Sequence, residues 1–395
     1  MSAFVAFAAF GSFWGVWGAS VPRVQHQAGV SDGRLGFALL FVGAGALPAM
    51  LLAGRALDRW GLKVAAGAIG LLGVVGAGLA LTAVNLPSLC AGLGVAGASS
   101  GAADVTMNAV AGRAEKIAGR PVITRVHGVF STFVVLTSLG AGVTSAASWP
   151  LAVPFVAVTV LCLVAGVVML AAISRSAIAD DGAAVGEAPA PGRVRLAPLL
   201  LVGALGALAF ASENAHQSWS AVFAQDELHA GAWLTTVAPA VFAGTVAITR
   251  FSAGGLKTTH ARSVILAGAL AAAGGALVIA GAPTLLVATL GLVLAGAGTA
   301  VLFPTLLGIV SRNVEEAYRG RATSIVSTVS YLGFLLGPVY VGAWADAAGL
   351  RGAMIAVAAL AAALLVLTPV LLRLSGFAVT AVTAGTSEPS ADTRV

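Results

Sequence analysis

The sequence predicts an all-α protein that lies within a lipid bilayer. Of its 395 residues 59% are hydrophobic and only 9% are charged. In a soluble domain about a quarter of all residues are charged. Apolar stretches of about twenty residues, the length that crosses a ~30 Å hydrocarbon core, recur along almost the whole chain. Twenty-residue apolar blocks exclude a β-barrel, whose strands alternate over short runs.

Polar and charged interruptions divide the chain into twelve predicted spans, and we expect the first to be a retained span, since no small-residue cleavage site follows it. The predicted spans are Ala3–Val21, Leu35–Gly54, Val64–Val84, Ser88–Gly112, His127–Ser148, Leu151–Ile173, Pro198–Trp219, Ala232–Phe251, Ser263–Ala280, Leu285–Val310, Ala322–Trp344 and Ala353–Leu372.

Basic residues predict the orientation of these spans. With an even number of spans both termini lie on one side, and the loops and span ends of that side carry eighteen of the 21 Lys and Arg residues. The other three are Arg23, Arg34 and Arg351. Cytoplasmic loops are enriched in Lys and Arg, so we expect both termini to be cytoplasmic. The net charge of +6 then reflects topology, and no nucleic-acid partner is indicated.

The two halves of the sequence look like copies of a six-span unit. The segment Gly92–Ala98 in the fourth span recurs as Gly291–Ala297 in the tenth, 199 residues later. At the same offset Arg113 recurs as Arg312 and Arg120 as Arg319. Parallel six-plus-six repeats form two bundles around a central site. We expect an N-terminal bundle at 1–173, a flexible cytoplasmic linker at 174–197, a C-terminal bundle at 198–374 and a disordered cytoplasmic tail at 375–395.

Asp104 and Asn108 form a polar face in the fourth span. They are four residues apart and so share one side of a helix, and Glu115 continues near that face as a possible gate residue. Asp104 lies ~13 Å of helix rise before Arg113, inside the cytoplasmic half of the membrane. Apolar surroundings favour the neutral acid, which makes Asp104 a candidate proton carrier or substrate ligand. The alternative is that Asp104 only bridges neighbouring helices.

Glu213, His216 and Gln217 form a second polar group, in the seventh span. Their spacing of three and four residues places them on one helix face. Glu213 lies about seventeen residues into the span, so we expect it towards the extracellular side. Such a face suits hydroxyl-rich substrates, proton exchange or an extracellular gate, and a purely structural cluster is the alternative.

Four other side chains are weaker candidates for the same cavity or its gates. His127 opens the fifth span close to the cytoplasmic interface, where a histidine is also commonly structural. Tyr331 in the eleventh span, together with Trp14 and Trp17 in the first, has the aromatic surface that stacks on sugars or cyclitols. Interfacial anchoring is the alternative for the two tryptophans.

The loop between the second and third spans, from Gly54 to Lys63, matches the pattern G-x-x-x-D-R-x-G-x-K. With it the chain resembles the major facilitator superfamily over roughly residues 1 to 375. The resemblance implies two six-helix bundles and a cytoplasmic gate at this loop. In such a gate, charged side chains of the loop are held against helix termini. The gate residues so implied are Gly54, Asp58, Arg59, Gly61 and Lys63.

Further segments are similar to the MosC-like and fucose-permease-like branch of that superfamily. They are Ser31–Gly36, Asp104–Asn108, Arg120–Pro121 with His127–Gly128, Glu213 with Trp219–Ser220, and Gly333–Pro338. The resemblance implies a secondary transporter of the cell membrane, coupled to protons and moving a small polar metabolite such as a sugar or cyclitol. An exporter of drugs or natural products by proton antiport, and a non-transporting receptor on the same fold, remain alternatives.

An enzyme or an ATP-driven pump is not indicated. The sequence contains no G-x-x-x-x-G-K-[ST] loop and no His/Cys spacing typical of a metal site. Its two cysteines, Cys90 and Cys162, both fall within predicted spans. We therefore expect no cofactor and no metal, and a monomer whose partners are the bilayer, a small-molecule substrate and a coupling proton.

Overall fold

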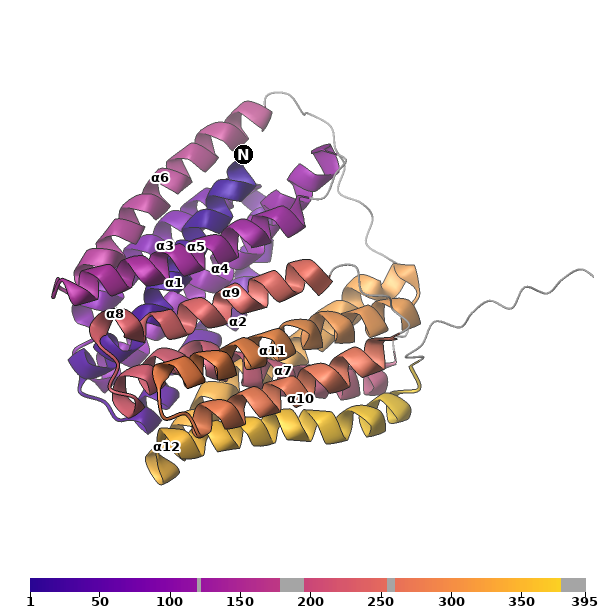
Figure 1. Cartoon of the computed structure of the whole chain (residues 1–395). Coiled ribbons are helices and arrows are strands. Elements are labelled where there is room, and N and C mark those ends of the chain that lie inside the picture. Colours follow the sequence, from indigo (N-terminus) through magenta and orange to yellow (C-terminus); the bar gives the residue numbers. More distant parts are fainter. Residues whose placement is uncertain (119–121, 178–194, 254–259, 378–395) are drawn as a thin grey trace, which may run out of the picture.

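The computed structural model describes residues 1–118, 122–177, 195–253 and 260–377, and the chain in these ranges is almost entirely helical (Figure 1). Its helices are α1 (Ser2–Ala28), α2 (Asp32–Trp60), α3 (Lys63–Thr82), α4 (Leu86–Ala118), α5 (Ile123–Ala146), α6 (Ala152–Ala177), α7 (Leu196–Val222), η1 (Phe223–Glu227), α8 (Ala232–Thr235), α9 (Val237–Ala253), α10 (Ala261–Ala280), α11 (Leu285–Asn313) and α12 (Glu316–Ser375).

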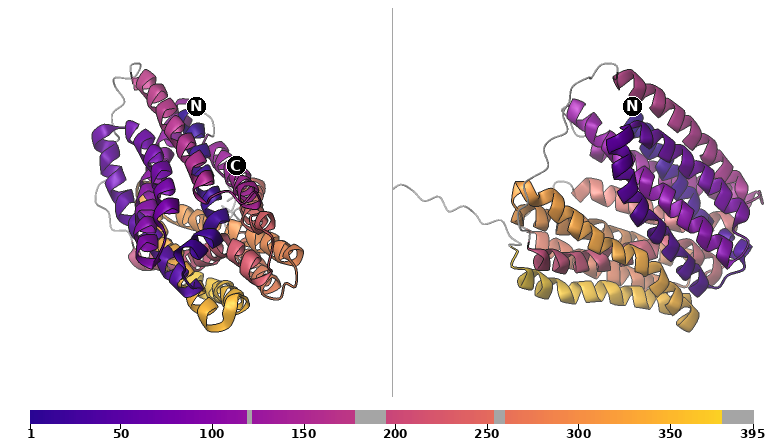
Figure 2. Two further views of the ribbon diagram at one scale, coloured as in Figure 1. Left: turned by 90° about the vertical axis from the view of Figure 1, so that its left-hand side faces the viewer. Right: turned by 180° about the vertical axis from the view of Figure 1, so that it is seen from behind.

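The predicted all-helical membrane fold is confirmed. Within the described residues, ten helices are long and apolar enough to cross a membrane. The last of these, Arg321–Ser375 in α12, is interrupted by non-helical backbone at Gly349 (φ 72°, ψ 171°), where the chain turns back on itself (Figure 2). Helix α4 is not among the ten, but it packs against α2 and α3.

Glycines with positive φ make the turns at both ends of α2. Gly29 (φ 61°) ends α1, and Ser31 then caps α2 by accepting a hydrogen bond from the Arg34 N–H. Gly61 (φ 67°) ends α2 at the loop motif and donates its N–H to the Leu57 carbonyl. A side chain is strained in this conformation, which explains the glycine of the motif.

The helices pack as two groups, α1–α6 and α7–α12, with η1 and α8 in the second. The groups touch mainly where α2 meets α12 and where α5 meets α8 and α9. Figure 1 shows the groups together at the end near α8 and diverging towards the other end. We call the end with Ser31 and Asp346 the closed end, and the end with Ala177 and Leu196 the linker end.

Asp346 of α12 joins the two groups at the closed end. Its carboxylate accepts the Gly33 N–H (2.8 Å) and the Ser31 hydroxyl (3.3 Å), both at the start of α2. One turn further into α2, a Cβ added at Gly36 would lie 3.0 Å from the Gly342 Cα. The two helix backbones therefore approach closely only because these positions are glycine.

The buried apolar side chains reflect the same arrangement. One continuous cluster runs through the N-terminal group and into the closed-end half of the C-terminal group, from Phe7 and Phe155 to Trp219 and Phe242. A second cluster, which includes Leu205 and Leu306, is confined to the linker-end half of the C-terminal group. Among the described residues, the core is thus shared at the closed end and separate at the linker end.

Close helix packing in the N-terminal group predicts that Gly97→Ala lowers stability. The added Cβ would lie 2.0 Å from the Val42 carbonyl oxygen, a backbone atom that moves only with its helix. We expect a loss of about 1–3 kcal/mol, seen as a lower Tm of the purified protein in detergent. Gly78→Ala is the control, because its Cβ would meet nothing within 4 Å. Equal Tm values for the two variants would contradict the packing described here.

Candidate functional site

Asp104 and Asn108 lie on one face of α4, as their spacing predicted. The Asn108 amide donates to the Asp104 carboxylate (3.1 Å) and to the Asp104 carbonyl (2.9 Å). Asp104 is only partly buried, and it lies within electrostatic range of Tyr331 on α12. The acid of the N-terminal group therefore interacts electrostatically with a residue of the C-terminal group.

Tyr331 belongs to an aromatic cluster that sequence reasoning did not find. Its ring packs edge-on against Phe210 of α7 (centroids 5.6 Å apart) and lies 6.1 Å from Phe334. Phe210 in turn lies against Phe303 of α11 at 4.2 Å. All four side chains are partly exposed, and they offer a ring-shaped ligand an apolar surface opposite Asp104.

Glu213 of α7 forms an ion pair with Arg250 of α9. One guanidinium nitrogen of Arg250 lies 2.8 Å and 3.0 Å from the two carboxylate oxygens. The Arg250 Nε also donates to the Ala300 carbonyl of α11 (3.3 Å). The Glu213 side chain is 15% exposed and that of Arg250 is 44% exposed. The ion pair therefore gives the Glu213 carboxylate a partner, while part of the Arg250 side chain stays accessible.

The position of Glu213 differs from the prediction. Helix α7 continues without a break into the π-helical turn η1, so seventeen residues precede Glu213 and fourteen follow it in the continuous helix. The prediction of a position towards the extracellular side rested on a seventh span that ended at Trp219, whereas the helix reaches Glu227. Glu213 lies near the middle.

Arg250 is the residue that sequence reasoning missed. It was counted with the basic residues of the cytoplasmic side, whereas the structure places it in α9, paired with an acid of α7. A signal was present, since Arg250 falls inside the predicted span Ala232–Phe251, and a cation within an apolar span marks a functional position.

His216 does not share the accessibility of Glu213. The His216 ring is 1% exposed and stacks on Phe242 of α9, with centroids 5.6 Å apart. Its Nδ1 lies 2.7 Å from the Ser212 carbonyl, which accepts a hydrogen bond from it, and its Nε2 has no hydrogen-bond partner among the described residues. Gln217, one residue further along α7, is partly exposed.

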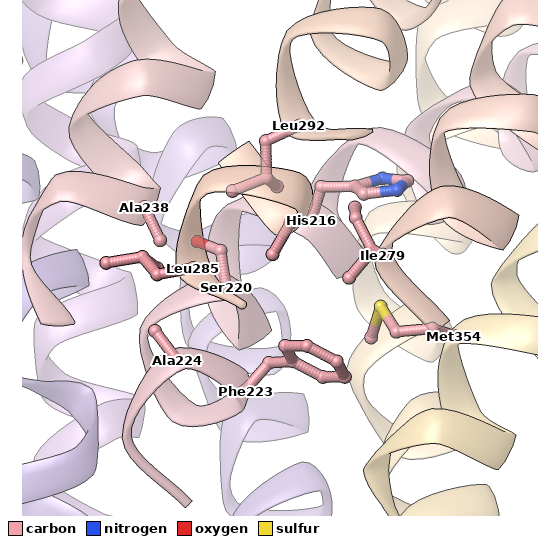
Figure 3. A pocket seen from close by; sticks show the side chains of 10 residues that line it. His216, Ser220, Phe223, Ala224, Ala238, Ile279, Leu285, Leu292 and Met354 are labelled. Atoms are coloured by element: carbon pink, nitrogen blue, oxygen red, sulfur yellow. The ribbon is translucent and has the colours of Figure 1, made fainter. Parts of the chain in front are cut away.

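A small pocket beside His216 lies within the C-terminal group. Figure 3 shows the His216 ring beside Ile279, with Ser220, Phe223 and Met354 around the same space. The space measures about 10 Å³, which is the volume of about one water. A substrate therefore does not fit there, and the His216 side chain is enclosed within the C-terminal group.

The remaining aromatic candidates lie along α1 and α5. His127 is exposed at the start of α5, packs edge-on against Phe7 (4.9 Å) and lies within electrostatic range of Arg250. Trp14 is partly buried and meets Phe13 edge-on at 5.5 Å. Trp17 is 5% exposed and belongs to the apolar core.

Glu115 caps a helix. Its carboxylate accepts the backbone N–H groups of Val122 (2.7 Å) and Ile123 (3.0 Å) at the start of α5. These two hydrogen bonds to the charged form lower the pKa of Glu115 below its usual range. The geometry gives Glu115 a structural role at the α4–α5 turn.

The loop motif lies at the linker end, away from the C-terminal group. Asp58, Arg59 and Lys63 are exposed, and the Arg59 guanidinium lies 5.3 Å above the Trp60 ring. Gly54 has open space around it, and Gly61 ends α2. Asp58 forms no ion pair with any residue in the described part of the chain.

Two helix groups of an apolar chain, with charged and aromatic side chains facing the region between them, define a multi-pass membrane transporter. The sequence matches the Major Facilitator Superfamily model over residues 2–259 and 253–391. The chain therefore belongs to the major facilitator superfamily, whose members are transporters and not enzymes, and it is an integral protein of the cell membrane.

Curated relatives agree with this assignment. An uncharacterised MFS-type transporter of Yersinia pestis is 29% identical over 330 residues, covering 82% of each chain. The membrane protein MosC of Rhizobium meliloti is 28% identical over 343 residues, covering 85% of this chain and 81% of MosC. The resemblance to the MosC-like branch is thus confirmed at modest identity.

Solved structures show the same fold at low identity. A bacterial homologue of the lysosomal transporter Spinster gives a TM-score of 0.71 at 14% identity, covering 94% of this chain and 96% of that one. The nucleoside transporter NupG gives 0.71 at 14%, covering 94% and 98%. The xylose transporter XylE of E. coli gives 0.70 at 15%, covering 93% and 94%.

The cap at α5 predicts a pH-dependent effect of Glu115→Gln. A lowered pKa in the folded state stabilises the fold above the ordinary glutamate pKa of about 4.3, and this stabilisation is lost as pH falls through and below that value. We expect the variant to have a lower Tm than the parent at neutral pH and a similar Tm in acid. Glu315→Gln, an exposed acid at the start of α12, is the control. A Tm difference that is the same at both pH values would contradict the cap.

Proposed function

We propose that the chain is a secondary active transporter that works by alternating access, is coupled to protons and moves a small polar metabolite such as a sugar or cyclitol. The observation that carries the proposal is that acids of both halves, Asp104 and Glu213, lie near the middle of their helices on surfaces turned to the region between the groups. Ionisable side chains at membrane depth mark transport pathways.

The proposed architecture has twelve spans in two bundles of six, 1–173 and 198–374. This number follows when α12 is counted as two helices at Gly349 and α4 is added to the ten apolar helices. The linker predicted at 174–197 and the tail predicted at 375–395 lie largely outside the described residues. With Arg250 removed from the count, seventeen basic residues still favour the linker side, so we place the linker end in the cytoplasm.

The aromatic cluster supports a ring-shaped polar substrate. Tyr331 and Phe210 offer faces for stacking, while Asp104, Asn108 and Arg250 supply hydrogen-bonding groups at the edges of the same region. Two solved proteins of the same fold are named as transporters of a nucleoside and of xylose, both of which contain a polar ring. All of these substrate-binding groups belong to a single chain, so the proposed site is complete in a monomer.

The Glu213–Arg250 pair supplies a coupling step. A proton that binds Glu213 neutralises the carboxylate and weakens its hold on Arg250, whose guanidinium then donates to oxygen atoms of the substrate. When the substrate leaves, Arg250 returns to Glu213 and the proton is released. Asp104 offers a second carboxylate for the same cycle, with Asn108 stabilising its charged form.

The loop motif is the proposed cytoplasmic gate. Gly54, Asp58, Arg59, Gly61 and Lys63 lie at the linker end, where the groups are apart, and Asp58 and Arg59 are free to contact helix ends of the C-terminal group when that end closes. His127 lies at the start of α5, also at the linker end, beside the opening between the groups that such a closure would narrow.

Proton flux in proteoliposomes tests the function. The external pH is followed while sugars, cyclitols, nucleosides and cationic dyes are added to liposomes containing the parent, Asp104→Asn, Glu213→Gln or the control Glu315→Gln. We expect flux with one polar ring compound, a loss of tenfold or more in Glu213→Gln or Asp104→Asn, and no loss in the control.

Other outcomes separate the alternatives. Flux with dyes alone would favour the exporter by proton antiport. Substrate binding without flux in the parent would favour the non-transporting receptor. Undiminished flux in both acid variants would contradict proton coupling through these carboxylates.

A further inference from the structure

A surface hollow at the linker end of the C-terminal group is not explained by transport. It lies between the start of α10 and the end of α12 and has a volume of about 740 Å³. Arg262, the second residue of α10, and Arg373, near the end of α12, both line it. The hollow is on a different part of the C-terminal group from the Glu213–Arg250 pair, which joins α7 to α9.

The charged part of the hollow fits an anionic group. Arg262 and Arg373 are exposed, and neither forms an ion pair with a residue that the structure describes. They come from two helices that meet at this hollow, so one phosphate between them can accept hydrogen bonds from both guanidinium groups. Arginine binds phosphate in this way, through planar pairs of N–H groups.

The apolar part of the hollow fits hydrocarbon chains. Val370 and Leu374, one turn apart on α12, are 50% and 67% exposed, and Phe377 lines the same space. These side chains lie beside the arginines at the end of an apolar helix, where the headgroup region of a bilayer gives way to acyl chains. A soluble anion would use only the arginines, whereas a phospholipid would cover both parts.

We propose that this hollow is a binding site for one anionic phospholipid of the leaflet at the linker end, with its phosphate between Arg262 and Arg373 and its acyl chains against Val370, Leu374 and Phe377. The ligand class follows from the juxtaposition of two unpaired cations and exposed apolar side chains. The site ties the ends of α10 and α12 to the membrane and is independent of the substrate.

Lipid binding to the purified, full-length protein tests the proposal. Phosphatidylglycerol and phosphatidylcholine are titrated in detergent and the bound lipid is counted by native mass spectrometry, for the parent and for the double variant Arg262→Gln/Arg373→Gln. A basic residue near anionic lipid contributes roughly fivefold in affinity, so we expect phosphatidylglycerol binding to weaken by about 25-fold in the double variant. Phosphatidylcholine binding should not change.

The controls separate this site from general charge effects. Arg125→Gln/Arg195→Gln removes the same charge from exposed positions elsewhere at the linker end and should leave binding intact. Unchanged Tm values in phosphatidylcholine nanodiscs would show that both double variants fold. Equal affinity for the two lipids, an equal loss in both double variants, or full displacement of the lipid by millimolar inorganic phosphate would each overturn the proposal.

Discussion

The structure depends on the contact between α2 and α12 at the closed end. A helix N-terminus presents four N–H groups without partners, and at α2 one of them is satisfied by Asp346 from the other helix group. Glycines behind this cap let the two backbones touch. This contact, together with that of α5 with α8 and α9, positions the side chains that face the region between the groups.

The charged side chains inside the apolar chain find their partners within their own helix group. Glu213 and Arg250 both belong to the C-terminal group, so their ion pair does not link the two groups. Asp104 accepts a hydrogen bond from Asn108 of its own helix. An unpaired charge in such apolar surroundings would cost several kcal/mol, so each pairing stabilises the helix group that contains it.

Sequence reasoning predicted the fold well and the site in part. Hydrophobic length and basic loops predict spans because they follow from the bilayer itself, and the Asp104–Asn108 face follows from helix periodicity. The partner of Glu213 did not follow, because α9 brings Arg250 to α7 only through tertiary packing. The cluster of Phe210, Phe303 and Tyr331 comes from three helices for the same reason. Asp346 carries no local sign that it caps a helix more than 300 residues away.

The most direct test of this account measures the linker-end distance between the two groups when the closed-end contact is removed. Spin labels at Ile117→Cys on α4 and Arg312→Cys on α11, both exposed, report that distance, and the native Cys90 and Cys162 are buried. The account predicts that Asp346→Ala shifts the distance distribution to shorter values, since weakening the closed end favours closure of the linker end. Asp346→Asn retains an oxygen acceptor for Gly33 and should shift it less. An unchanged distribution in Asp346→Ala would contradict the central role of the contact.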